Sequence, residues 1–121
     1  MRGLLACMAA LGFAVLQPAP VSARETAIKT GNDLLDMCAS GASAWSGGAC
    51  YGFILGVYRG LSVYGEATNH PLICLSEDVT VGQTQLIVQA YLHAHPKEMS
   101  GAAEWGVASA LLDAFPCPKT K

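Results

Sequence analysis

The sequence has few charged residues and lacks the short motifs that most often mark catalysis or nucleotide binding. Only 13% of its residues are Asp, Glu, Lys or Arg, and no basic cluster is present, so binding to nucleic acid is not expected. There is no Cys-x-x-Cys pair, which argues against a zinc ribbon or a thioredoxin-like motif, and no Gly-x-Ser-x-Gly elbow. No glycine-rich phosphate-binding loop precedes a helix. These absences predict a protein without enzymatic activity.

Histidines are also scarce, and their spacing does not suit a metal site. His93 and His95 are two residues apart, which on a helix places them on different faces, and His70 lies far away in a predicted loop. A zinc site needs three or four converging ligands, so we predict no metal and no other cofactor. The carboxylates Glu77 and Asp78 are adjacent just before a predicted helix, where the helix dipole favours negative charge.

The first 23 residues have the pattern of a secretory signal peptide. Arg2 is followed by an apolar run from Gly3 to Leu16, and a small-x-small cleavage site ends at Ala23. The apolar run is shorter than the about 20 residues that a membrane-spanning helix needs, so a transmembrane anchor is the less favoured interpretation. We therefore predict a signal peptide over residues 1–23 and one exported, periplasmic domain over residues 24–121.

The cysteines that remain after the predicted cleavage are Cys38, Cys50, Cys74 and Cys117. An even number in a small exported domain predicts disulfides rather than a metal site or a catalytic thiol. Of the three possible pairings, the predicted helices favour one. Cys38 ends a first helix and Cys50 begins a second, whereas Cys74 precedes a third helix and Cys117 follows a fourth. If the last two helices are antiparallel, their outer ends meet, so we predict Cys38–Cys50 and Cys74–Cys117, with contributions of roughly 3 and 4 kcal/mol in the loop-entropy model.

The segment from Asn32 to Ala49 predicts a short helix followed by a loop. Asn32 can cap the helix, and Leu34, Leu35 and Cys38 then fall on one face. Residues 39–49 are rich in Gly, Ser and Ala, which is loop composition. Trp45 is the one large apolar side chain in this loop. We predict that it packs onto the core, and stacking against a ligand is the alternative.

A second helix is predicted from about Cys50 to Glu66, and its glycines recur every four residues. Gly52, Gly56 and Gly60 form one smooth ridge, although each glycine costs about 1 kcal/mol of helix propensity. Such a ridge indicates that another backbone approaches closely. We favour tight packing against a neighbouring helix of the same domain, and the alternative is the seam of a homodimer.

A third helix is predicted from a capping box at Thr80 and Gln83 to about Ala94. The residues predicted to share its broad apolar face are Ile87, Ala90, Tyr91 and Ala94. A polar stripe at a spacing of four residues is formed by Gln85, Gln89 and His93. We expect solvent to cover this stripe, and a polar recognition edge is the alternative.

The last helix is predicted to begin at the His95-Pro96 junction and to end before Pro116, because proline suits a first helical turn and cannot continue a helix. Its 3-4 repeat of small and apolar residues consists of Met99, Ala102, Ala103, Gly106, Val107, Ala110, Leu111, Ala114 and Phe115. No alternating run is long enough for a strand pair. The sequence therefore predicts an all-α fold: a small disulfide-stapled bundle of four helices, or five with a short extra turn.

Elements spread over most of the predicted mature chain together resemble the Rap/Tai family. They are Asp33-Leu34-Leu35 with Cys38, Cys50-Tyr51-Gly52-Phe53-Ile54-x-Gly56, Cys74, Gln83, Tyr91-Leu92, His95-Pro96, Ala110-Leu111 and Phe115-Pro116-Cys117. Two positions depart from the family pattern: Leu75 follows Cys74 where a proline is usual, and no second histidine is present near Met99. The family consists of small exported helical proteins, the best known of which protect bacteria from cell-wall amidases delivered by type VI secretion.

This resemblance implies an immunity protein that inhibits a type VI secreted peptidoglycan amidase by covering its active site, often as a homodimer. The alternative is a periplasmic stress-related chaperone or a general periplasmic binding protein with the same fold. The expected partner is a protein, with no nucleic acid and, after signal cleavage, no membrane. Because loops carry recognition on a rigid scaffold, we predict that Trp45, Asn69 and His70 contact the partner.

Overall fold

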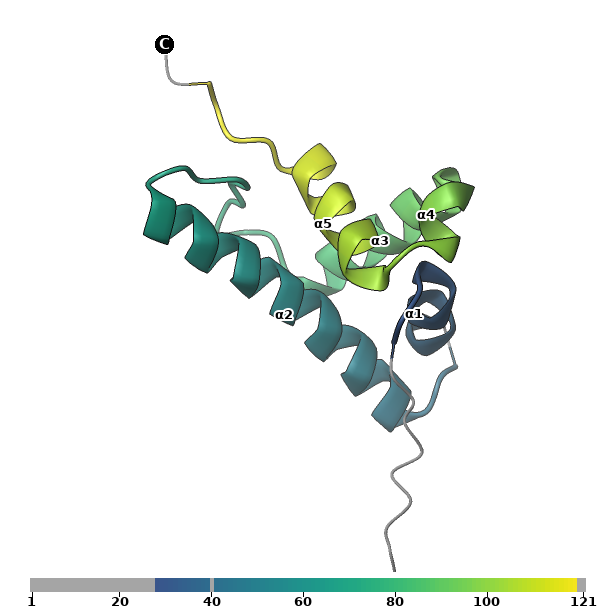
Figure 1. Cartoon of the computed structure of the whole chain (residues 1–121). Helices are drawn as coiled ribbons and strands as arrows, with labels where there is room; N and C mark the ends of the chain where they lie inside the picture. The colour runs from purple at the N-terminus through teal and green to yellow at the C-terminus, as the bar shows by residue number, and fades with distance from the viewer. Residues whose placement is uncertain (1–27, 40, 120–121) are drawn as a thin grey trace, which may run out of the picture.

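The computed structural model describes residues 28–39 and 41–119, and the predicted signal peptide over residues 1–23 lies outside this part of the chain. Its helices are α1 (Gly31–Cys38), α2 (Ala44–Thr68), α3 (Val81–Ala94), α4 (Pro96–Ser100) and α5 (Ala103–Ala114). The other four helices lie together along one side of the long α2 (Figure 1). Within the described ranges there is no strand, and β-type pairing is limited to two isolated bridges, Thr30 with Ala102 and Ile73 with Pro116. The predicted all-α bundle is confirmed, with five helices.

The core lies between α2 and the group of shorter helices. Its largest fully buried apolar side chains are Leu34 of α1, Ile54 of α2, Val88 and Leu92 of α3, and Val107 and Leu111 of α5. The short α4 buries none of its residues. α1, α2, α3 and α5 contribute buried residues to one contiguous cluster, and the partly buried Met99 of α4 packs against it.

α1 begins one residue after Thr30, and Thr30 rather than Asn32 is its N-cap. The Thr30 hydroxyl accepts a hydrogen bond from the Asp33 backbone N–H at 3.2 Å, while Asp33 Oδ2 accepts one from the Thr30 backbone N–H at 2.8 Å. This reciprocal capping box satisfies two backbone donors at once. The prediction of an Asn32 cap was wrong because Thr30-x-x-Asp33 offers both halves of the box, and Asn32 lies exposed inside the helix.

Stability is expected to fall on acidification partly because Asp33 becomes protonated. Hydrogen bonds from the Thr30 backbone, the Thr30 hydroxyl and the Lys29 backbone hold the pKa of Asp33 below its ordinary value. A carboxyl of this kind stabilises the folded state above its unfolded pKa of about 3.9, and the contribution is lost as the pH falls through the folded-state pKa. Urea unfolding at about pH 2 to 7 should therefore show a smaller acid-induced loss of stability for Asp33→Asn than for the wild type. Equal losses in the two proteins would contradict this assignment.

The segment predicted as a loop over residues 39–49 is helical in its second half. Ser43 caps α2, and its hydroxyl accepts a hydrogen bond from the Ser46 backbone N–H at 3.1 Å, so the helix begins at Ala44. Trp45 is 63% exposed, and the prediction that it packs onto the core was wrong. The reason is rotational: Trp45 lies five residues, or about 140° of helix rotation, from the buried Cys50.

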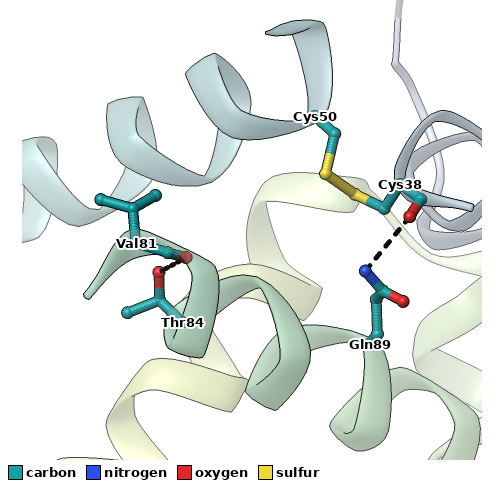
Figure 2. Close-up of a disulfide and its surroundings, with 5 residues drawn as sticks. All are labelled: Cys38, Cys50, Val81, Thr84 and Gln89. Atoms are coloured by element: carbon teal, nitrogen blue, oxygen red, sulfur yellow. Dashed lines mark hydrogen bonds between the residues drawn. A yellow bond between two sulfur atoms is a disulfide. The ribbon is translucent and has the colours of Figure 1, made fainter. Parts of the chain in front are cut away.

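Two disulfides connect the ends of the helices. Cys38–Cys50 joins the end of α1 to α2 with both cysteines buried, and Cys74–Cys117 joins the connection before α3 to the segment after α5. These are the pairs expected from the helix order. Near the first bridge, Gln89 Nε2 of α3 donates a hydrogen bond to the Cys38 carbonyl oxygen at 3.3 Å (Figure 2). α1, α2 and α3 are thus connected at one corner of the bundle.

α3 begins with the predicted capping box but buries a different face. The Thr80 backbone N–H donates to Gln83 Oε1 at 2.7 Å, which confirms the box. The buried residues of α3 are Thr84, Val88 and Leu92, whereas of the predicted face Ile87 and Tyr91 are half-buried and Ala90 and Ala94 are exposed. Thr84 tolerates burial because its hydroxyl donates to the Val81 carbonyl at 2.7 Å (Figure 2).

Because α3 buries a different face from the predicted one, the environment of its polar stripe also differs from the prediction. Gln85 and Gln89 are half-buried and His93 is exposed, so the prediction of a solvated stripe was wrong for the two glutamines. Gln89 contributes to the fold through its bond to the Cys38 carbonyl.

The predicted last helix is broken into α4 and α5 at Gly101 and Ala102. The Gly101 carbonyl accepts a hydrogen bond from the Gly31 backbone N–H at 3.1 Å, and the Ala103 backbone N–H donates to the Lys29 carbonyl at 3.0 Å. These bonds to the entry of α1 replace helical bonds at the break. In α5 the predicted small-residue face is confirmed from Ala103 to Leu111, since Ala103, Gly106, Val107, Ala110 and Leu111 are buried, whereas Ala114 is exposed.

Candidate partner-binding surface

Several large apolar side chains lie on the surface of this small domain. They are Trp45, Tyr51, Val63 and Tyr64 on α2, Leu86 on α3, and Trp105 and Leu112 on α5, each at least 40% exposed. Trp and Tyr are enriched among the residues that dominate binding energy in protein interfaces. The domain thus presents possible anchors for a protein partner, held on helices that two disulfides restrain.

The outer face of α2 is open along most of its length. Of its 25 residues, only Cys50, Ile54 and Gly65 are buried. A Cβ atom added at Gly52, Gly56 or Gly60 would meet no atom within 4 Å. The favoured prediction, that this glycine ridge packs tightly against a neighbouring helix of the same domain, was therefore wrong, because no other helix comes into contact with these three positions.

The predicted contact residues do not form one site. Trp45 lies in the first turn of α2, whereas Asn69 is its C-cap and His70 follows, so the two groups are about 36 Å apart along the helix. Asn69 adopts the left-handed conformation with φ 55°, and His70 Nδ1 lies 2.9 Å from the Thr68 carbonyl oxygen. Asn69 also lines a hollow of about 420 Å³ beside Leu61 and Leu72. A partner that contacts both ends would have to follow the whole outer face of α2.

A family model describing Rap1a immunity proteins matches residues 30–117. The chain belongs to this family. The match begins at the N-cap of α1 and ends at Cys117, so it includes all five helices of the described part and both disulfides. Neither a comparison with curated proteins nor one with solved structures found a match. The resemblance seen in the sequence is thereby confirmed.

Membership of the Rap1a immunity family implies that the chain acts by binding a protein effector. Among the described residues, no group of three or more His, Cys, Asp or Glu could hold a metal ion. His95 makes its contacts within the domain: its ring stacks on Tyr91 with 3.9 Å between centroids, and its Nδ1 lies 2.8 Å from the Tyr91 carbonyl oxygen. No described helix combines the length and the apolar composition that crossing a bilayer requires.

Two grooves of this Rap1a family member adjoin α2 and were not predicted. One of about 300 Å³ lies between α2 and α5, where Val57, Gly60 and Leu61 face Glu104, Trp105 and Ala108. The other, of about 290 Å³, lies between α2 and the start of α3, and Arg59 and Glu77 are among its lining residues. Arg59 also lies over the Tyr58 ring, with its guanidinium carbon 5.5 Å from the centroid.

Trp105 is an exposed aromatic residue that was not among the contact residues predicted from the sequence. It is 69% exposed, the highest value among the large apolar side chains of the described residues. One signal could have identified it: Trp105 lies outside the 3-4 repeat of small residues in α5, so it falls on the face opposite to the core. A large aromatic residue on the polar side of a helix often marks an interface.

Proposed function

We propose that this protein is a periplasmic immunity protein that binds a type VI secreted peptidoglycan amidase and covers its active site. The observation that carries the proposal is the match of residues 30–117 to Rap1a immunity proteins. The predicted signal peptide supports export, and two disulfides suit an oxidising compartment. Inhibition by occlusion requires only a rigid complementary surface, which the outer face of α2 and the grooves beside it offer, and it requires no catalytic residue.

An inhibition assay tests this proposal directly. The exported domain from Arg24, with both disulfides formed, would be used to recover partners from periplasmic and secreted extracts. We expect a cell-wall amidase to be recovered and to lose its activity on purified peptidoglycan when the domain is added at equal molar amount. The proposal is wrong if the amidases of the same cell form no complex with the domain, or if a bound amidase remains fully active.

The exposed apolar side chains also favour one alternative, a periplasmic stress-related chaperone or general binding protein. Such a protein would bind unfolded clients without preference, and exposure of further apolar surface at low pH would increase its binding. An aggregation assay with an unrelated denatured protein at about pH 3 and pH 7 separates the two functions. Suppression of aggregation at low pH would support the alternative, and a strict requirement for one amidase would exclude it.

We also propose that a second copy of the chain packs along the glycine ridge of α2 at Gly52 and Gly56. A Cβ atom at either position would meet no atom within 4 Å, so a second α2 could approach the backbone closely there. Sedimentation equilibrium should then show a dimer whose dissociation constant rises at least about tenfold in Gly52→Leu/Gly56→Leu, because two bulky side chains hold the backbones apart. Gly82→Leu on α3, where an added Cβ has no neighbour closer than 3.9 Å, is the matched control. Identical association of all three proteins would remove the ridge as the seam.

A further inference from the structure

The groove between α2 and α5 has an apolar floor. Val57 and Leu61 of α2 and Ala108 of α5 line it, and Gly60 contributes no side chain. A Cβ at position 60 would have no neighbour within 4 Å, so the missing side chain leaves space that no other described residue fills. The volume of about 300 Å³ is at the small end of ligand pockets and suits a single long side chain.

An aromatic ring and a carboxylate occupy the α5 side of the same groove. Trp105 lines it and is 69% exposed. Glu104 also lines it, in the first turn of α5, where the helix dipole favours its negative charge. Among the described residues, no hydrogen-bond donor or cation contacts the Glu104 carboxylate, and α5 itself contains no Lys or Arg. The groove therefore combines an apolar floor with two groups that attract a cation.

We propose that this groove binds one arginine or lysine side chain of the protein partner. The aliphatic stem would lie on Val57, Leu61 and Ala108, as the stems of long basic side chains commonly lie on apolar surface. The charged head would lie against the Trp105 ring and the Glu104 carboxylate, since both a tryptophan ring and a carboxylate attract a cation. An uncharged apolar side chain would fill the floor but would leave the carboxylate without a partner.

The inference rests on the proposed function in one respect, namely that the basic side chain belongs to a bound effector. Its chemistry can be tested without any effector. Because the chain has only two tryptophans, a ¹⁵N-labelled protein shows two indole N–H signals, one for Trp105 and one for Trp45. Trp45 serves as an internal control, since it is similarly exposed at 63% but lies in the first turn of α2, outside the groove.

Titration with Nα-acetyl-arginine N-methylamide is the first experiment. We expect a saturable shift of the Trp105 indole signal in the millimolar range, as befits one side chain, and no comparable shift at Trp45. The corresponding citrulline compound, which has nearly the same shape without the charge, should bind at least about threefold more weakly. Equal binding of arginine and citrulline, or no shift at Trp105, would overturn the proposal. A Trp105 shift that follows protein concentration instead of the titrant would place a second copy in the groove and would also overturn it.

Matched variants locate the binding within the groove. Glu104→Gln should weaken arginine binding about threefold or more, whereas Glu77→Gln, outside this groove, should not. Gly60→Leu should abolish the Trp105 shift by filling the floor, whereas Gly48→Leu, an equivalent change on the same helix outside both the groove and the glycine ridge, should leave it unchanged. Circular dichroism and thermal unfolding of each variant verify the fold, and loss of binding in both glycine variants would contradict the assignment.

The amidase assay supplies an independent result. If the groove holds a basic side chain of the effector, Glu104→Lys should weaken inhibition at least about tenfold through like-charge repulsion. Asp36→Lys, at an exposed carboxylate of α1 that lines neither groove, should have little effect. Arginine binding without any amidase inhibition would contradict the proposed function and leave the groove chemistry standing. Inhibition that is insensitive to Glu104→Lys would support the proposed function and would contradict the binding of an effector side chain in this groove.

Discussion

Replacing Cys74 and Cys117 by serine is expected to lower the free energy of unfolding by about 4 kcal/mol. The bond spans 43 residues of sequence, and a closed loop of that length removes much of the freedom of the unfolded chain. Cys74 is exposed and Cys117 is half-buried, so the substitution opens little cavity. The loss therefore arises almost entirely in the unfolded state. It is a large fraction of the 5–15 kcal/mol typical of a folded domain.

Urea unfolding measures both parts of this expectation. The midpoint should fall, and the m-value should rise, because an unfolded chain without the crosslink exposes more surface. The Cys38→Ser/Cys50→Ser variant is an instructive comparison, since its bond spans only 12 residues and is worth about 3 kcal/mol by the same reasoning. Both of those cysteines are buried, however, so polar replacements there add a desolvation cost that the Cys74–Cys117 variant does not have.

If the substitutions of Cys74 and Cys117 lower the free energy of unfolding only slightly, the backbone contacts beside the disulfide would be the explanation. The Cys74 N–H donates to the Phe115 carbonyl at 2.9 Å, and Ile73 and Pro116 form an isolated bridge. If the loss of stability is below about 1 kcal/mol with an unchanged m-value, these contacts persist in the unfolded ensemble and the loop-entropy account does not hold.

Gly31→Ala is expected to destabilise the domain by about 2–3 kcal/mol. A Cβ at this position would lie 2.7 Å from the Glu98 carbonyl oxygen and 2.8 Å from Met99 Cα. Both are backbone atoms, so no side-chain rotation relieves the contact, and α1 must separate from α4. The separation would also strain the hydrogen bond from the Gly31 N–H to the Gly101 carbonyl. The helix-propensity gain of alanine, at most about 1 kcal/mol, cannot offset these losses.

Gly56→Ala is the matched control, and the opposite sign is expected. No atom lies within 4 Å of a Cβ at position 56, which is in the middle of α2. Alanine should therefore stabilise the helix by up to about 1 kcal/mol when unfolding is measured at a concentration at which the domain is monomeric. Thermal and urea unfolding of both variants check the pair. Equal effects of the two substitutions would show that the contact between α1 and α4 is not tight in solution.

Features of the fold that depend on neighbours in sequence were predictable. The capping box of Thr80 and Gln83 places the start of α3, and Pro96 starts a new helix because its missing N–H has no helical partner. The 3-4 repeat from Ala103 to Leu111 identifies the buried face of α5, where small residues outnumber large ones. The order of the helices then brings the cysteines together in the pairs that the structure contains.

The errors concern features that depend on what covers a helix. The glycines of α2 were predicted to pack closely because glycine disfavours a helix, yet a Cβ atom at any of the three positions would meet no atom within 4 Å. The predicted apolar face of α3 included Ala90 and Ala94, which are exposed, and omitted Thr84, whose local hydrogen bond to the Val81 carbonyl allows it to be buried. One helix was predicted where α4 and α5 are separate, because the bonds that replace the helical ones come from Lys29 and Gly31, far away in sequence.

The sequence by itself determined the all-α fold class, the pairing of the cysteines and the family, because capping, periodicity and cysteine spacing act over short distances or through the order of elements. Only the tertiary structure decided which side chains remain available to a partner. Both tryptophans are exposed, but Trp45 lies in the first turn of α2, whereas Trp105 lines a groove with Glu104. That difference follows from the packing of α2 against α5, whose contacting residues lie more than 40 positions apart in the chain.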